Sequence, residues 1–181
     1  MRVSTFDIEG PLLLEPKVFG DHRGFFLESW NAAGFAEAGL AIDFLQDNHS
    51  RSQQGVLRGL HYQNPLPQGK LVRVVNGAVF DVAVDLRQSS ATFGRWIGIE
   101  LSGENQRMFW VPPGFAHGFL TLEDDTDFLY KCDAYYTPTH EHTLAWDDPT
   151  VAIDWPIGGL DVQLSDKDRL GSPLQAVEAF E

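Results

Sequence analysis

The residues of this chain that could do chemistry are its histidines and a group of cations. One pair among the six histidines, His140 and His142, has the H-x-H spacing that metal ligands often use. That pair follows Thr137-Pro138-Thr139, which indicates a loop, and His61 is followed two residues later by Gln63 instead of a second histidine. A metal-dependent barrel would bring several histidines and a carboxylate together around Fe, Mn or Zn. The spacing therefore predicts no metal site.

Cations are concentrated in the first part of the chain. Residues 1–73 carry seven basic and eight acidic side chains, whereas residues 74–181 carry six basic and eighteen acidic ones. The net charge of -13 would repel a polyanion such as duplex DNA, so nucleic acid is not an expected partner. A small anionic ligand would meet the first segment, although single cations are most often solvated surface charges. The cations concerned are Arg23, Arg51, Arg58, Lys70 and Arg73.

Several catalytic motifs are absent from the sequence. It contains neither G-x-G-x-x-G nor G-x-x-x-x-G-K-[ST], and no G-x-S-x-G elbow, which argues against dinucleotide folds, P-loops and hydrolase nucleophiles. Cys132 is the single cysteine, so an internal disulfide is impossible and we expect the protein in the cytoplasm. No apolar run approaches the ~20 residues of a membrane span, and the N-terminal residues do not resemble a signal peptide. We therefore expect no membrane partner.

Short strands are the elements that must position any site. Turn residues separate them, among them Phe19-Gly20-Asp21 and Asn76-Gly77, the second being typical of a β-hairpin. A helical pattern is limited to residues 31–38 and to a start at Ser165. We predict one mainly β domain over residues 1–181, a sandwich or barrel with room for one ligand. The predicted strands are Leu12–Val18, Gly24–Trp30, Val56–Tyr62, Leu71–Val75, Gly77–Leu86, Gly94–Leu101, Met108–Val111, Phe119–Leu122 and Thr126–Lys131.

A set of ordered segments is far more specific than any single residue. The segments are FGDHRGFFLE (19–28), QDNHS (46–50), GVLRGLHYQ (55–63), QGKLVR (68–73), PGFAHGF (113–119), FLYK (128–131) and LSDKD (164–168). Together they resemble the dTDP-4-dehydrorhamnose 3,5-epimerase family, and the resemblance runs from about residue 6 to about residue 175.

The resemblance implies a cupin or jelly-roll β-barrel that works as a homodimer without a metal or organic cofactor. Its substrate would be the nucleotide sugar dTDP-4-dehydro-6-deoxy-D-glucose. Epimerisation at C3 and C5 would give dTDP-4-dehydro-L-rhamnose, a step in dTDP-L-rhamnose and polysaccharide biosynthesis. The missing histidine two residues after His61 agrees with such metal-free chemistry.

The resemblance also assigns four catalytic roles. Epimerisation beside a ketone needs a base on one face, an acid on the other and a group that stabilises the enolate. By resemblance these are His61, Tyr130 and Lys70, with Asp168 orienting His61. Each has an alternative: a hydrogen-bonded core histidine, a packed aromatic, a surface lysine, and an aspartate that caps a helix after Ser165.

The positions of Arg58 and His61 conflict with a regular strand. Residues three apart point to opposite faces, so both can serve one site only where a bulge at Gly59 interrupts the alternation or the ligand spans a rim.

By the same resemblance, further residues contact the substrate. Arginine suits a diphosphate because its planar fork binds oxygens bidentately, and an aromatic side chain can stack on thymine. The diphosphate ligands would be Arg23 and Arg58, and the stacking residues Phe19 and Tyr136. The other contacts would be Glu28, Gln46, Asp47, Asn48, Lys70, His117, Glu141 and Lys167.

Three other functions remain open. A related dTDP-4-keto-sugar mono-epimerase or ketoisomerase of a specialised deoxysugar pathway would share much of the site. A metal-dependent cupin oxygenase would contain Fe, Mn or Zn, and a sugar-binding barrel would bind without turnover.

Overall fold

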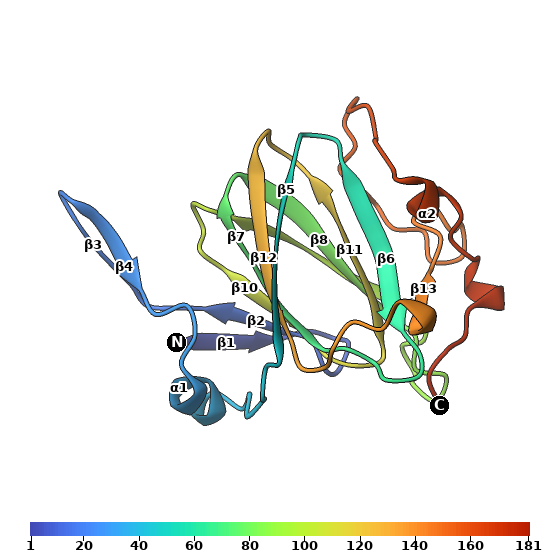
Figure 1. The fold of residues 1–181 in the computed structure, drawn as a ribbon, viewed down its shortest axis with the longest axis horizontal. Coiled ribbons are helices and arrows are strands. Elements are labelled where there is room, and N and C mark those ends of the chain that lie inside the picture. The colour runs from blue at the N-terminus through green and yellow to red at the C-terminus, as the bar shows by residue number, and fades with distance from the viewer.

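Two antiparallel sheets face each other and form an open barrel in the computed structural model, which describes residues 1–181 (Figure 1). The six-stranded sheet has the order β1(Arg2–Thr5), β2(Leu12–Glu15), β10(Met108–Val111), β7(Lys70–Asn76), β12(Thr126–Cys132) and β5(Gln46–Ser52). The five-stranded sheet has the order β13(Glu141–Thr143), β6(Leu57–Gln63), β11(Phe115–Thr121), β8(Ala78–Asp85) and β9(Trp96–Ser102). The mainly β, jelly-roll architecture predicted from the sequence is confirmed.

Helices are few and short. They are α1(Ala32–Glu37), α2(Asp166–Arg169) and the 3-10 turns at Pro138–His140 and Leu174–Ala176. The predicted helix 31–38 is present as α1, and Asn31 is its N-cap, accepting from the backbone N–H groups of Ala33 and Gly34. None of these helices has the length or the apolar character needed to cross a membrane.

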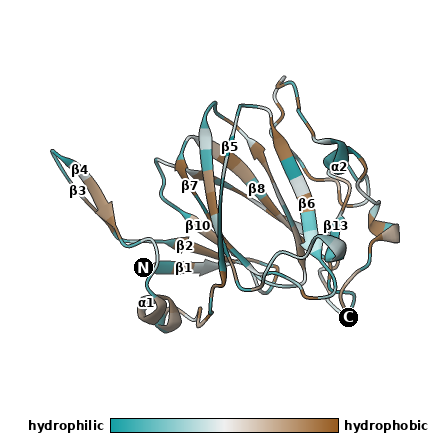
Figure 2. Cartoon of the chain, in the orientation of Figure 1, coloured by the Kyte–Doolittle hydropathy of each residue, from teal (hydrophilic) through white to brown (hydrophobic).

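Three apolar clusters hold the layers together. The first fills part of the space between the sheets and includes Val72, Phe109 and Phe128. The second lies between the five-stranded sheet and the C-terminal segment, which covers that sheet with residues such as Trp155 and Leu174. The third joins α1 to the six-stranded sheet. Apolar residues run along much of β8 and β11, whereas hydrophilic stretches interrupt β6 (Figure 2).

The strands β3(Val18–Asp21) and β4(Gly24–Leu27) form a hairpin that projects away from both sheets (Figure 1). Its apolar side chains have no core to cover them: Phe19, Phe25 and Phe26 are 52%, 60% and 68% exposed. Exposed apolar surfaces of this kind are typical of contacts with another molecule.

Several sequence-based predictions are wrong in detail. Asn76-Gly77 does not close a hairpin, because β7 and β8 belong to different sheets. Phe19-Gly20-Asp21 is strand, and the turn lies at residues 22–23. Strands β1, β5 and β13 were not predicted, and β11 begins four residues before the predicted Phe119.

Candidate active site

The open half of the barrel contains a polar cavity between the two sheets. One part has a volume of about 270 Å³, and an adjoining part toward the mouth has about 330 Å³. Both parts are lined by His61 of β6, Lys70 of β7 and Tyr130 of β12. The structure therefore brings the predicted base, acid and enolate-stabilising residue to one cavity.

A bulge in β6 turns both Arg58 and His61 into this cavity. His61 pairs with His117 of β11, but Arg58 pairs with Phe119, so β6 contains one extra residue between the two pairs. The bulge needs glycine at position 59, where φ is +122° and an added Cβ would lie 2.5 Å from the Cα of Gly118. Of the two alternatives that the spacing of Arg58 and His61 left open, the bulge at Gly59 is the one present.

His61 forms a close pair with Asp168. Its Nε2 lies 2.6 Å from Oδ1 of Asp168, which also accepts from the backbone N–H of Gly59 at 3.3 Å. The second carboxylate oxygen accepts from the hydroxyl of Ser165 at 2.6 Å. Burial alone would raise the pKa of Asp168, but these hydrogen bonds bring that pKa down to about 2. An ionised Asp168 fixes the hydrogen of His61 on Nε2 and leaves Nδ1 as the basic atom.

The capping role considered for Asp168 is also present. Ser165 is the N-cap of α2 and accepts from the backbone N–H of Asp168 at 3.2 Å. The two alternatives are therefore compatible, because the backbone N–H of Asp168 closes the cap while its carboxylate binds His61.

Lys70 places an ammonium group in the cavity wall without a direct partner. The residue is 9% exposed, and its Nζ makes neither a hydrogen bond nor a salt bridge within the chain. Burial lowers the pKa of Lys70, and the nearby Cys132, Asp133, Glu141 and Asp81 oppose that shift. An unpaired buried cation is costly unless an anion develops beside it, as an enolate oxygen would.

Tyr130 lines the cavity from the opposite sheet to His61. It is half-buried, and burial raises the pKa of its phenol, so the hydroxyl is protonated at neutral pH. A protonated phenol across the cavity from a histidine base can supply a proton to the second face of a substrate.

Polar residues surround the mouth of the cavity. The hydroxyl of Tyr136 donates to Glu141 at 2.6 Å, and Lys167 forms an ion pair with the same carboxylate at 2.5 Å. The side-chain oxygen of Gln46 accepts from the backbone N–H of Tyr136 at 2.9 Å. Tyr136 is 47% exposed, so part of its side chain is accessible to a ligand.

Three more predicted residues line the cavity. Arg58 donates to Ser52 at 3.1 Å and has no carboxylate partner, which leaves a free guanidinium at the rim. Asn48 of β5 lines the outer part. His117 lies deeper and binds Asp81 at 2.9 Å.

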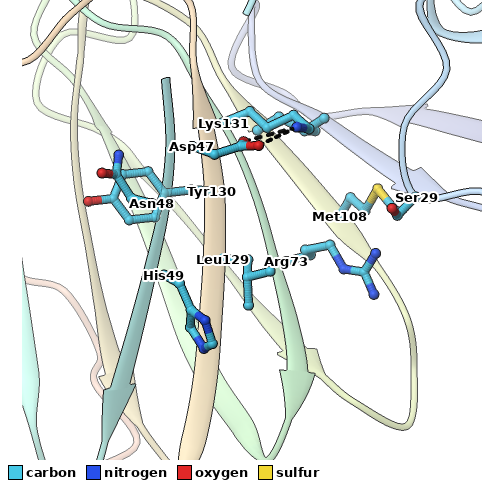
Figure 3. A pocket seen from close by; sticks show the side chains of 10 residues that line it. Ser29, Asp47, Asn48, His49, Arg73, Met108, Leu129, Tyr130 and Lys131 are labelled. Atoms are coloured by element: carbon cyan, nitrogen blue, oxygen red, sulfur yellow. Dashed lines mark hydrogen bonds and ion pairs between the residues drawn. The ribbon is translucent and has the colours of Figure 1, made fainter. Parts of the chain in front are cut away.

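Four predicted contact residues lie elsewhere. Asp47 points to the outer face of the six-stranded sheet, where it pairs with Lys131 at 2.9 Å; Figure 3 shows this pair on the side of Arg73 and Met108, away from Asn48 and Tyr130. Phe19 and Arg23 belong to the projecting hairpin, and Glu28 follows it in an exposed position. Within one chain the cavity lacks these side chains.

Two residues beside the cavity were not singled out by the sequence reasoning. The sequence pattern places Asp81 only within an apolar strand, although a carboxylate inside such a run is an informative signal. The pattern around Ser165 indicates a helix cap alone. No three His, Cys, Asp or Glu side chains come together as a possible metal site.

Comparison with known proteins places this cavity in a family. The family model described as dTDP-4-dehydrorhamnose 3,5-epimerase matches residues 5–176. A protein of that name from Pseudomonas aeruginosa is 52% identical over 181 residues and 99% of both chains.

Solved structures agree with this match. An epimerase from Legionella pneumophila, crystallised in complex with dTDP-4-keto-L-rhamnose, superposes with a TM-score of 0.94 at 52% identity and covers 98% of this chain and 94% of its own. A 3'-monoepimerase from Streptomyces bikiniensis, in complex with dTDP-quinovose, gives a TM-score of 0.88 at 36% identity over 94% and 86% of the two chains. The chain belongs to the dTDP-4-dehydrorhamnose 3,5-epimerase family.

Proposed function

We propose that this protein epimerises dTDP-4-dehydro-6-deoxy-D-glucose at C3 and C5, giving dTDP-4-dehydro-L-rhamnose, without a metal or organic cofactor. The observation that carries the proposal is one cavity in which the His61–Asp168 pair, the unpaired ammonium of Lys70 and the protonated phenol of Tyr130 face a common space. Base, acid and a cation for the enolate are what epimerisation beside a ketone requires.

The first step is removal of the proton beside the ketone. Nδ1 of His61 takes the proton from C3 or C5, and the C–H electron pair moves toward the C4 carbonyl to form an enolate. Asp168 stabilises the imidazolium through its hydrogen bond with Nε2, which has a length of 2.6 Å. The ammonium of Lys70 stabilises the negative oxygen at C4. In a site that excludes water, this electrostatic stabilisation is stronger than it would be in bulk water.

The second step returns a proton to the opposite face. Tyr130 donates its hydroxyl proton to the same carbon, which inverts the configuration and restores the ketone. The tyrosinate and the imidazolium then exchange protons with solvent, which readies the site for the other carbon. The catalytic set is thus His61, Tyr130, Lys70 and the orienting Asp168.

The mouth of the cavity suits the nucleotide. Arg58 offers its free guanidinium to the diphosphate, and the exposed ring of Tyr136 offers a stacking face to thymine. Gln46, Asn48, Glu141 and Lys167 supply hydrogen bonds around it, and His117 contacts the sugar.

A second copy of the chain completes the site in our proposal. The hairpin carries Phe19 and Arg23 away from their own cavity, and the side chain of Arg23 is 78% exposed, with Asp21 of its own turn as its ionic partner. In a homodimer this hairpin would bring both side chains to the partner's nucleotide. The single, buried cysteine suits a reducing compartment, and we propose that the dimer acts in the cytoplasm.

The reaction is tested by incubating the protein with dTDP-4-dehydro-6-deoxy-D-glucose and trapping the product with a nicotinamide-dependent reductase. A dTDP-L-rhamnose product, formed equally well after treatment with a chelator, supports the proposal. Inversion at a single carbon, or a ketone moved to C3, would reassign the protein to a mono-epimerase or ketoisomerase. Activity lost with chelator and restored by one metal would contradict the metal-free mechanism.

The dimer is tested by complementation between two inactive variants, Arg23→Ala and His61→Ala, produced together in one cell. If Arg23 acts across the interface, random assortment restores about a quarter of the wild-type activity, because half of the dimers are mixed and each mixed dimer has one intact site. If Arg23 serves its own chain, no site is intact and activity is not restored.

A further inference from the structure

Strand β8 contains two fully buried carboxylates, and only one is neutralised by an arginine. Asp85 accepts from Arg87 at 2.8 and 2.9 Å and from the hydroxyls of Ser90 and Thr92. Asp81 is also 0% exposed, yet its single hydrogen-bonding partner is Nε2 of His117, at 2.9 and 3.1 Å from its two oxygens. A carboxylate buried with so few donors is costly for the fold alone.

The sheet register places Asp81 beside the catalytic residues. On β11, His117 pairs directly with His61 of β6, and Phe119 pairs with Asp81 of β8. Asp81 is therefore the diagonal neighbour of His117 on the cavity side. The imidazole of His117 also stacks on Phe128, with ring centroids 6.2 Å apart. Asp81 thus contacts one edge of the ring and Phe128 one face.

The positive charge of Lys70 partly opposes the rise that burial causes in the pKa of Asp81. Both groups are buried, and neither has an ionic partner of fixed charge within salt-bridge distance. Burial lowers the pKa of Lys70 and raises that of Asp81, and each charge opposes the shift of the other. Cys132, Asp133 and Glu141 also oppose the lowering of the pKa of Lys70.

We infer that Asp81 is a positioning residue of the active site, which holds His117 as the Nε2–H tautomer. The inference rests on the function proposed above. With Nε2–H donated to Asp81, Nδ1 of His117 remains an acceptor for a sugar hydroxyl in the cavity that the ring lines. Asp81 itself does not touch the reacting atoms; it acts through His117.

The test compares Asp81→Asn with Asp85→Asn, a matched change of a fully buried carboxylate on the same strand. We expect Asp81→Asn to lower kcat on the order of a hundredfold, with KM and the Kd for dTDP changed less than about twofold. Asp85→Asn should lower the Tm, because it removes the partner of Arg87, and should leave kcat unchanged. A wild-type kcat in Asp81→Asn, from a wild-type protein that is itself active, would overturn the inference; an inactive wild type would defeat the proposed function instead.

A double-mutant cycle separates positioning from a general loss of packing. If Asp81 acts through His117, the double variant of Asp81→Asn and His117→Asn is no slower than His117→Asn alone. Independent, additive losses would contradict the inference.

Nitrogen-15 NMR of labelled histidine in the wild-type protein gives a readout that needs no variant of Asp81 to fold. His117, assigned by its loss in His117→Asn, should carry its hydrogen on Nε2 when neutral. A hydrogen on Nδ1 would overturn the inference.

Discussion

Two histidine–aspartate pairs of similar geometry lie on opposite sides of the barrel wall. His61 and Asp168 meet at 2.6 Å in the cavity, and His49 and Asp127 meet at 2.9 Å on the outer face of β5 and β12. Asp127 also binds Arg51 at 2.7 Å, whereas His61 is the single ionisable donor to Asp168. The side chain of His49 is 57% exposed against 28% for His61.

The difference indicates that the surroundings of such a pair, and not the pair alone, would determine whether it takes part in catalysis. Around His61 the cavity adds an acid, Tyr130, and an unpaired cation, Lys70. Around His49 the nearby lysine, Lys131, is already paired with Asp47 on the same outer face (Figure 3). Arg73 lines the same outer pocket without an ionic partner, but Asp127 is shared with Arg51 and His49 is largely exposed to solvent, so we expect the outer pair to have no part in turnover.

Replacing the two histidines gives the largest contrast. We expect His61→Ala to lower kcat by about 10²–10⁴-fold, because the general base is lost, while dTDP still binds. His49→Ala should keep the wild-type kcat. Steady-state kinetics and dTDP titration of both variants measure this, and equal activity of His61→Ala and His49→Ala would break the comparison.

Removing the acid separates proton exchange from inversion. Tyr130→Phe keeps His61, so the substrate should still exchange its protons with solvent, while epimerisation falls by about 10²-fold or more. Deuterium incorporation and product formation are followed in the same sample. If exchange falls in proportion to epimerisation, the assignment of acid and base to separate faces is wrong.

The orienting carboxylate has a smaller effect that depends on pH. Asp168→Asn should lower kcat by roughly 10–100-fold, as is usual when a carboxylate that orients a histidine is removed. It should also change acid stability, since the pKa of Asp168 falls from 3.8 to about 2 on folding. That stabilisation is present above pH ~4 and is lost as the pH falls toward ~2. Denaturant titrations from pH 6 to 2 should show the wild-type advantage shrinking over this window, and a constant advantage would contradict it.

The outer pair should affect stability alone, and only slightly. In Asp127→Asn the ionic contacts of Arg51 and His49 are lost, so the Tm should fall by a small amount that added salt reduces. Activity should stay at the wild-type value. A large loss of kcat in Asp127→Asn would show that the outer face takes part in the reaction.

The sequence predicts the fold class and most strands because their residues alternate toward an apolar core. It misses β5 because the inward side chains of that strand, Gln46, Asn48 and Ser50, face a polar cavity, so apolar alternation is absent. The sequence locates the Asn76-Gly77 turn correctly. It does not predict that the strands on either side, β7 and β8, belong to different sheets, because strand pairing depends on residues far away in the sequence.

For the candidate site as well, the sequence predicts the residues but not the contacts that depend on the assembled fold. Ordered motifs indicate His61, Tyr130, Lys70 and Asp168 together, and the structure places all four in or beside one cavity. The pairing of Asp81 with His117 depends on the register of β8 and β11, which spacing alone does not determine. The distance of Arg23 from its own cavity is likewise a property of the folded hairpin.

The most direct test of the central claim is NMR of dTDP-4-dehydro-6-deoxy-D-glucose incubated with the wild-type protein in D₂O, with a reductase present to trap the product. We expect deuterium at both C3 and C5, with inverted configuration at each carbon. A substrate that binds but gains no deuterium at either carbon would contradict the His61 base and the epimerase assignment.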